Sequence, residues 1–315
     1  MKKRLVSIII SMLMIATILS VAGTVNATDW PMLGGNPERT GYSPDEAPES
    51  NNTLWIYNIP GWIGSSAAIV DDNVYIGGSA QRVVALNPDG TEKWTFDTDG
   101  SVSSTPTVVD GKVVFGEEDI PGELYCVNAE TGIEEWSFTT GHWIKYSPVI
   151  VNGLVYVESF DNNLYCLYLE NGTEKWSYPD AYGDCSVANG YVYTFSEIGG
   201  NFLVLNANTG VLESSIYIDE WALATAAPVI DGDYAYFGVS GFTMDFKIYC
   251  IDLIAENIEW SYSITDQATS GCAVDSTKVY IAYQGGSWPD YYGKLVCLDK
   301  TTGAFQWDFS TNEGK

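Results

Sequence analysis

The sequence contains a single histidine, His142, and its six cysteines include no adjacent pair and no Cys-x-x-Cys motif. Catalytic triads and metal centres built on histidine are therefore excluded. The cysteine spacing excludes structural zinc, dithiol redox chemistry and covalent c-type haem. No stretch of helical periodicity follows the first 27 residues, which excludes the helical fold classes.

Basic residues are scarce, because 14 Lys and Arg stand against 41 Asp and Glu, for a formal net charge of −27. Nucleic acids and anionic membrane surfaces both require a basic surface, so we expect neither as a partner. An acidic surface suits a cationic partner, divalent ions or a salty exterior, and it also keeps a protein soluble. With 315 residues, 46% of them hydrophobic, the chain is long enough to bury a large core.

The first 27 residues have the pattern of a secretory signal peptide. The basic start Met1-Lys2-Lys3-Arg4 precedes an uncharged apolar run from Leu5 to Val21, and Val25-Asn26-Ala27 has the small residues of a cleavage site. The alternative is an uncleaved N-terminal anchor, because the run is of borderline spanning length. Either form predicts a protein that is secreted or held at the cell surface, and cleavage would leave a mature chain with no transmembrane domain.

A phrase recurs along the remaining sequence at intervals of 38 to 47 residues. It begins with a small residue, passes through a turn that usually contains Thr-Gly or Asn-Gly, and ends with a tryptophan. The small residues are Ala85, Cys126, Cys166, Val204, Cys250 and Cys297. The matching tryptophans are Trp94, Trp136, Trp176, Trp260 and Trp307, with Trp55 as an earlier anchor and Ser214 in place of the fourth. An internal period of this length indicates a repeat architecture.

Each repeat reads as four short strands. In the second repeat they are Thr105–Val109, Lys112–Gly116, Glu123–Asn128 and Glu135–Phe138, and Asp110-Gly111 is a hairpin signal between the first two. Four-stranded units at this period predict an all-β fold, a β-propeller of antiparallel blades. A spare fourth strand at Leu54–Ile59 precedes the first complete set. Six blades are therefore predicted, and an incomplete seven-blade ring is the alternative.

The predicted organisation divides the chain into three parts. They are a signal peptide (1–27), an N-terminal segment (28–52) and a propeller (53–315), with blades at about 63–99, 102–140, 144–179, 183–218, 224–264 and 269–311. We expect each tryptophan to fasten two neighbouring blades, because a buried Trp ring covers roughly 150–250 Å². The small residue on the third strand is expected to leave the space for the ring from the neighbouring blade. The seam beside the fourth blade, where Ser214 replaces Trp, is then expected to open first. The cysteines are expected to be unpaired core residues.

The repeated phrase resembles the tryptophan-docking repeat of pyrroloquinoline quinone (PQQ)-type propellers. Asp29-Trp30-Pro31-Met32, followed by Arg39-Thr40-Gly41-Tyr42-Ser43, resembles the N-terminal segment of their small secreted members. The resemblance covers residues 29–312 and implies the propeller fold. It leaves the function open, because the family contains both quinoprotein dehydrogenases and non-catalytic scaffolds. The bacterial outer-membrane assembly scaffold lipoprotein has a similar repeat, but its acylated cysteine is missing here.

For the dehydrogenase branch, the resemblance implies a quinone held between a Trp and a disulfide of adjacent cysteines, with calcium bound by Glu and Asn and an Asp as base. The sequence lacks adjacent cysteines and any insertion long enough to cover a cofactor. We therefore expect no catalytic residues, no resident metal and no PQQ. A PQQ- and calcium-dependent quinoprotein dehydrogenase is the alternative. Asp161-Asn162-Asn163 is the segment considered for a calcium contact, on oxygen ligands alone.

In a four-stranded blade, the turns after the first and third strands lie on one face, and the loops after the second and fourth strands lie on the other. These loops vary in length and carry aromatic and acidic residues. The candidates for a binding face are Trp62, Trp143, Tyr182, Trp221, Phe242, Trp288, Tyr291, Tyr292, Glu117, Glu118 and Asp119. Variable loops on a rigid scaffold commonly bind partners, so we predict a scaffold that binds a protein or glycan at the cell exterior. The alternative is that the rings plug the central channel or pack against one another.

Overall fold

The computed structural model describes residues 29–45, 52–197, 200–219, 222–224, 226–241, 246–264, 268–285 and 292–310. The predicted signal peptide lies outside these residues. Strands, turns and loops account for the described residues, and none of them belongs to a helix that could cross a membrane.

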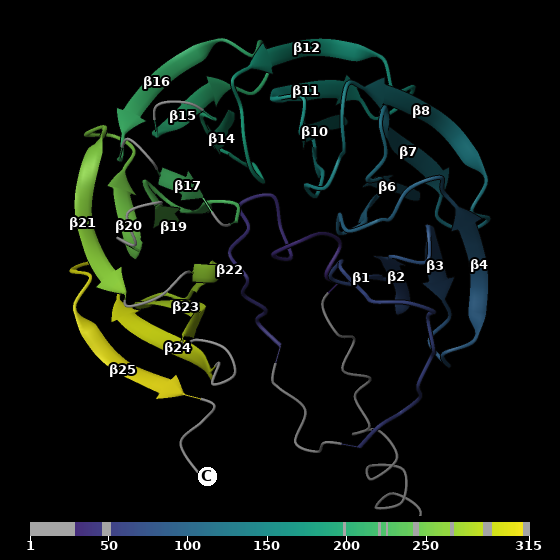
Figure 1. Cartoon of the computed structure of the whole chain (residues 1–315), viewed down its shortest axis with the longest axis horizontal. Coiled ribbons are helices and arrows are strands. Elements are labelled where there is room, and N and C mark those ends of the chain that lie inside the picture. The colour runs from purple at the N-terminus through teal and green to yellow at the C-terminus, as the bar shows by residue number, and fades with distance from the viewer. Residues whose placement is uncertain are drawn as a thin grey trace, which may run out of the picture.

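Six antiparallel sheets are arranged around a central axis, as predicted (Figure 1). The strands of the first three blades are β1 (Ala68–Val70), β2 (Asn73–Gly78), β3 (Arg82–Leu86), β4 (Glu92–Asp97), β5 (Thr107–Val109), β6 (Lys112–Gly116), β7 (Gly122–Asn128), β8 (Glu134–Thr140), β9 (Val149–Val151), β10 (Leu154–Ser159), β11 (Asn163–Tyr168) and β12 (Glu174–Pro179). Those of the last three are β13 (Ser186–Ala188), β14 (Tyr191–Phe195), β15 (Asn201–Asn206), β16 (Leu212–Tyr217), β17 (Ala222–Ala224), β18 (Val229–Asp231), β19 (Tyr234–Gly241), β20 (Phe246–Asp252), β21 (Asn257–Ile264), β22 (Ala268–Val274), β23 (Lys278–Gly285), β24 (Tyr292–Asp299) and β25 (Phe305–Ser310). In the fifth blade, β17 and β18 share the innermost position, because both pair with β19.

The recurring phrase has the same register in every blade. In the second blade, Thr107, Val114, Cys126 and Trp136 form one row across the four strands. A shift of register follows the small residue of the third strand in all six blades, as between Cys126 and Val127. This repeated β-bulge increases the local twist of the outer hairpin. The repeat in sequence is therefore a repeat of backbone geometry.

Each tryptophan of the repeat except Trp307, for which the predicted docking is wrong, docks on the following blade rather than on the small residue opposite it. The indole N–H groups of Trp55, Trp94, Trp136, Trp176 and Trp260 donate to backbone carbonyls of the next blade at 2.9 to 3.1 Å. The rings stack on the turn glycines Gly90, Gly132, Gly172, Gly210 and Gly303, where an added Cβ would lie 2.5 to 2.7 Å from an indole atom. The space for the ring is therefore created by the missing glycine side chain, and the small residue pairs with the Trp of its own blade.

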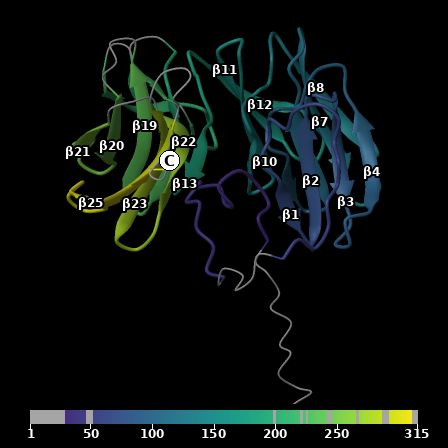
Figure 2. The same ribbon diagram turned by 60° about the horizontal axis from the view of Figure 1, so that its bottom comes forward.

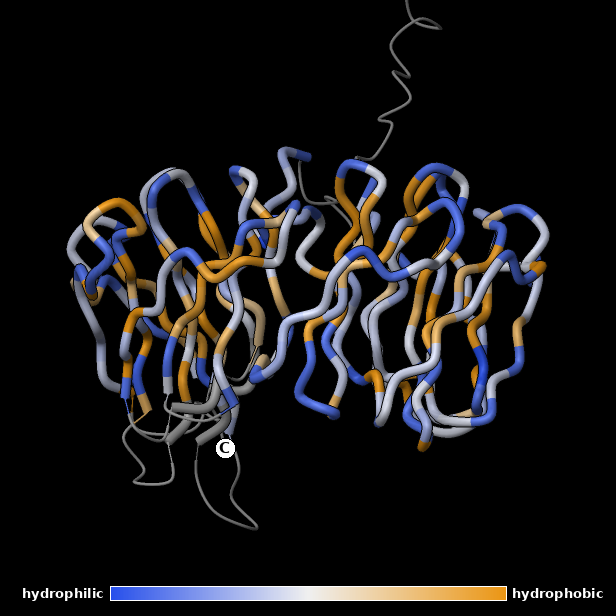
Figure 3. Tube along the Cα trace, turned by 90° about the horizontal axis from the view of Figure 1, so that it is seen from above, coloured by the Kyte–Doolittle hydropathy of each residue, from blue (hydrophilic) through white to orange (hydrophobic). Residues whose placement is uncertain are grey.

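Five hydrophobic cores of described residues lie between consecutive blades, and no such core joins the last blade to the first. Figure 1 accordingly shows these two blades apart. Trp307, on the outer strand of the last blade, is 45% exposed, whereas Trp94, Trp136 and Trp176 are 7–9% exposed. The six blades thus form an open arc within the described structure. In the side view of Figure 3, apolar and polar stretches alternate along its strands.

The segment Leu54–Ile59, predicted as a spare strand, is extended but belongs to no sheet. Among the described residues, no third strand of a blade pairs with this segment, so the segment is not part of a β-sheet. It still lies against the first blade, because Trp55 docks on Gly90 and the Tyr57 hydroxyl donates to Glu92 Oε2 at 2.6 Å.

The N-terminal segment, residues 29–45, lies at the centre of the arc (Figures 1 and 2). Its backbone carbonyls accept hydrogen bonds from the innermost strands of five blades. The acceptors are Trp30, Pro31, Pro37, Glu38 and Thr40, and the matching donors are the N–H groups of Ile69, Val108, Val187, Ile230 and Val274. The segment therefore satisfies inner-edge donors and links the blades across the axis, a role that the sequence did not predict.

Candidate functional site

We call the end of the arc that carries the loops after the second and fourth strands the loop face, and the opposite end the turn face. Large apolar side chains are exposed on the loop face: Trp62 is 59% exposed, Trp143 is 37% exposed, and Ile63 and Ile120 are also exposed. Single exposed apolar residues are ordinary, and the turn face also exposes Ile133, Val211 and Ile254, so the two tryptophans are what distinguish the loop face. The structure thus places two of the predicted aromatic candidates, Trp62 and Trp143, in solvent.

Five rings pack together on the loop face of the third and fourth blades. Phe160 lies at the centre, 5.1 Å from Tyr146 in a stacked arrangement, 6.0 Å from Trp143 and 5.9 Å from Tyr182 between ring centroids. His142 contacts Trp143 edge to face at 5.2 Å. The predicted candidates Trp143 and Tyr182 therefore both contact other rings, so the alternative of mutual packing holds for this part of the face, while the Trp143 ring keeps an exposed side.

A buried carboxyl group lies near this aromatic cluster. Glu158, at the end of β10, is 1% exposed, and its Oε1 accepts a hydrogen bond from the Thr194 hydroxyl. Its Oε2 has no hydrogen-bond partner among the described residues. Burial raises the pKa of Glu158 well above the ordinary value, and the nearby carboxyl of Asp184 raises it further. Tyr146 has a raised pKa as well, because of its own burial and the neighbouring groups Tyr182, Glu158 and Asp184.

Arg39 of the N-terminal segment is buried beside the same group of residues. Its guanidinium donates to the carbonyls of Leu33 and Ser147 at 2.8 Å and to that of Cys185 at 3.3 Å. Burial lowers the pKa of Arg39, and the charge of Asp184 opposes this effect. Asp184 in turn accepts the Ser147 N–H at 2.6 Å. A single buried cation therefore joins the N-terminal segment to the third and fourth blades.

Glu158 should make stability depend on pH. In the native state its pKa is raised, so between the unfolded-state pKa of about 4.3 and the native one the folded protein holds a proton that the unfolded chain releases. Stability is then greatest below this interval and falls as pH rises through it. Relative to Glu158→Gln, the wild type is expected to lose up to about 1.4 kcal/mol per pH unit in this range, measured by urea denaturation from pH 4 to pH 8.

The exposed Glu170→Gln is the matched control for this experiment. It is expected to follow the wild type at every pH. A Glu158→Gln profile parallel to that of the wild type would contradict a raised pKa at Glu158.

The predicted acidic candidates occupy different environments. Glu117 is buried, and its Oε2 accepts the N–H groups of Asp99 and Gly100 at 3.0 Å, so it shapes the loop. Burial raises the pKa of Glu117. Glu118 is half-buried, with its N–H bonded to the Ser101 carbonyl, and Asp119 is exposed. Of the three, Asp119 is the freest to meet a partner.

Other predicted candidates cannot be placed on the face. Trp221, Phe242, Trp288 and Tyr291 lie outside the described residues, and Tyr292 is the half-buried first residue of β24. In the segment considered for calcium, Asp161 accepts hydrogen bonds from the N–H of Gly141 at 2.8 Å and from the hydroxyl of Tyr165 at 2.8 Å. These contacts give Asp161 a structural role in the loop.

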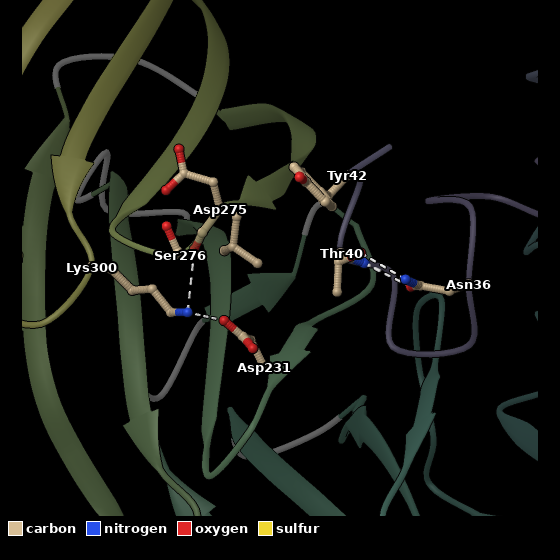
Figure 4. Close-up of a pocket in the computed structure, with 8 residues that line it drawn as sticks. Asn36, Thr40, Tyr42, Asp231, Asp275, Ser276 and Lys300 are labelled. Atoms are coloured by element: carbon tan, nitrogen blue, oxygen red, sulfur yellow. Dashed lines mark hydrogen bonds and ion pairs between the residues drawn. The ribbon is translucent and has the colours of Figure 1, made fainter. Parts of the chain in front are cut away.

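A polar pocket of about 680 Å³ opens on the turn face, between the N-terminal segment and the last two blades (Figure 4). Lys300 reaches into it, forms an ion pair with Asp231 and donates to the Asp275 carbonyl at 3.3 Å. Across the pocket, Asn36 and Thr40 bond to each other. Its charged groups therefore have partners within the protein. The sequence did not predict this pocket, since it depends on where the N-terminal segment lies.

The residues do not fit the quinone site that the family resemblance implies. All six cysteines are unpaired and buried in the strands or beside them, so no disulfide of adjacent cysteines is available. In the described part of the chain, no three His, Cys, Asp or Glu side chains come together as metal ligands. The pair of adjacent cysteines that would hold the quinone is thus missing from the sequence.

Comparisons with known proteins agree with the fold. The family described as outer membrane protein assembly factor BamB matches residues 45–120 and 118–309, whereas no curated protein matches the chain in sequence. BamB from Moraxella catarrhalis is similar in structure, with a TM-score of 0.62 and 15% identity over 78% of this chain and 75% of that one. The quinohemoprotein alcohol dehydrogenase from Comamonas testosteroni has a TM-score of 0.72 and 13% identity over 92% of this chain and 68% of that one.

At such identities the structural likeness shows the fold alone. The family match is broader evidence, because it spans most of the sequence, including all six blades. The chain therefore belongs to the BamB-like family of PQQ-type β-propellers.

Proposed function

We propose that the protein is an exported, non-catalytic scaffold that binds a polypeptide partner through its loop face. The observation that carries this proposal is the group of exposed apolar side chains there, Trp62, Ile63, Ile120 and Trp143. Aromatic rings suit both sugars and proteins, but the two isoleucines suit apolar side chains, which favours a polypeptide. The name of the structural relative BamB, an assembly factor, supports a scaffold role by analogy.

The position of Asp29, the first described residue, supports the same proposal. Asp29 lies at the turn face, where its Oδ1 accepts the N–H of Asp71 in the first hairpin turn. A chain exported or held through its N-terminal residues would thus present the loop face away from the point of attachment.

Peptide selection tests this proposal. A random peptide library is selected on the purified mature chain, and the recovered peptides are measured against Trp62→Ala/Trp143→Ala and against Tyr217→Ala. We expect to recover peptides with apolar anchor residues. The double substitution should reduce their affinity about 30-fold, which is the usual effect of losing an aromatic contact at the centre of an interface. Tyr217, on the outer strand β16, is about as exposed as Trp62 and serves as the control.

Two outcomes would contradict the proposal. The first is peptide binding that the double substitution leaves unchanged. The second is binding on a glycan array that the same substitution abolishes, which would identify the face as a sugar-binding surface. Circular dichroism of each variant checks that folding is retained.

A further inference from the structure

One of the five seams between described blades differs from the others. Between the fourth and fifth blades, Ser214 holds the tryptophan position and Glu256 holds the glycine position. Glu256 retains the left-handed backbone of its glycine counterparts, with φ of 54°. The tryptophan and the glycine that form the docking contact at the other seams are thus both replaced here, whereas the backbone conformation of the turn is the same.

A cavity of about 360 Å³ lies at this seam. Ser214 and Glu256 line it, and it opens at the turn face of the rim, away from the loop face, because Asn189 and Gly232 of two hairpin turns also border it. Its other walls include the rings of Tyr191 and Tyr193 and the residue Leu253. Leu253 stands at the position of Ala129, Leu169, Ala207 and Lys300, whose carbonyls accept the indole N–H at the other seams. The cavity is therefore a docking slot without its tryptophan.

An indole ring in the usual pose does not fit this slot. At the other seams, a Cβ on the turn glycine would lie 2.5 to 2.7 Å from the ring, and Glu256 carries such a Cβ. A ligand that enters must therefore approach differently from the docked tryptophans or be narrower than an indole.

The negative charges that border the slot favour a positively charged ligand. Glu213, Asp233 and Glu256 all border it, and none of them forms an ion pair within the described structure. At the seam between the first two blades, the residue before the tryptophan is Lys93, and its ammonium group lies 2.6 Å from Glu130 of the next blade. At the fourth seam the same position holds Glu213. The same position holds Lys175 at the third seam and a glutamate, Glu135 or Glu259, at the second and fifth seams. The fourth seam therefore lacks the cation of the first and third seams, and three carboxylates border its empty slot.

We propose that this slot binds the guanidinium group of an arginine side chain presented by a polypeptide. A guanidinium is flat and narrow, stacks on tyrosine rings, and offers five N–H donors to carboxylates and to the Leu253 carbonyl. A lysine ammonium would meet the carboxylates but would neither stack nor donate in a plane. The site lies on the rim at the turn face, so it does not depend on the proposed role of the loop face.

The test uses capped tripeptides of the form Gly-X-Gly, with X as Arg, Lys or Trp, titrated into the full mature chain and followed by NMR. We expect saturable binding of the Arg peptide, weaker binding of the Lys peptide, and no binding of the Trp peptide. Glu213→Gln/Glu256→Gln should weaken the Arg peptide at least about tenfold, because it removes two charge-assisted contacts. These side chains are exposed, so the variant is expected to fold.

Glu170→Gln, in the corresponding turn of the third blade, is the matched charge control and should leave the affinity unchanged. Preferential binding of the Trp peptide would overturn the proposal and identify the slot as an indole site. Absence of Arg binding, or Arg binding equally weakened by Glu170→Gln, would also overturn it, the latter because it would reflect net charge alone.

Discussion

Replacing Arg39 with methionine is expected to lower the free energy of unfolding by about 3–5 kcal/mol, because hydrogen bonds from a buried charged donor are lost and their acceptors are left without partners. Methionine keeps much of the side-chain volume but cannot donate to the carbonyls of Leu33, Ser147 and Cys185. It also removes the larger of the two positive charges that act on Asp184, the other being that of Lys145. Urea denaturation followed by circular dichroism measures the loss.

A second readout separates this role from a general loss of packing. Arg39 lies between Glu38 and Thr40, whose carbonyls bond to Ile230 and Val274 of the last two blades. If Arg39 holds the N-terminal segment in place, these two amides should exchange with solvent faster in Arg39→Met, while amides in the outer strands keep their protection.

Arg82→Met is the matched control. Arg82 pairs with Asp97 at 3.3 Å, and both side chains are well exposed. The expected loss there is below about 1 kcal/mol, because exposed ion pairs contribute little. Equal losses at positions 39 and 82 would contradict the role assigned to the N-terminal segment.

The sequence predicted the features that depend on short residue patterns and recur in every blade. Six copies of one phrase predicted the blades, and hairpin signals such as Asp110-Gly111 predicted their first turns, where both residues have positive φ. The docking of Trp94 and Trp136 was also predictable, but its partner was not. The sequence pointed to the small residue ten positions earlier, whereas the ring requires the turn glycine of the next blade. Contacts between blades are not visible within one repeat.

The centre of the molecule was less predictable. The N-terminal segment contains Pro31 and Pro37, and its carbonyls act as acceptors for the inner strands, so it shows none of the alternation that marks a strand. Glu158 lies on β10, which is buried on both faces because it lies between two blades. An alternating pattern would place its carboxyl in solvent. A glutamate inside the run Leu154–Ser159 was the available signal, but only the packing of neighbouring blades explains its burial.

The seam between the fourth and fifth blades leads to the last prediction, which restores the missing contact. Ser214→Trp together with Glu256→Gly should stabilise the protein by about 2–4 kcal/mol. Burying an indole contributes up to about 4–6 kcal/mol by area, and part of this is offset by ordering the side chain. The backbone requires no change, since Glu256 already has the left-handed conformation of its glycine counterparts.

The single substitutions distinguish this explanation from a general benefit of added apolar surface. Ser214→Trp alone should be neutral or destabilising by about 1–3 kcal/mol, because the ring meets the Glu256 Cβ. Glu256→Gly alone should change stability by less than about 1 kcal/mol, since relief of the positive φ is offset by backbone entropy. The midpoints of these ranges give a favourable coupling energy of about 4 kcal/mol for the double-mutant cycle.

Amide exchange completes the test. In the wild type, β16 and β20 should open at lower free energy than the strands at the tryptophan seams, and the double variant should remove this difference. Additive effects of the two substitutions, or wild-type protection at this seam equal to the others, would show that the tryptophan and glycine do not act as a pair. The same double variant fills the slot, so it should also abolish binding of the Arg tripeptide, whereas Glu256→Gly alone should only weaken it.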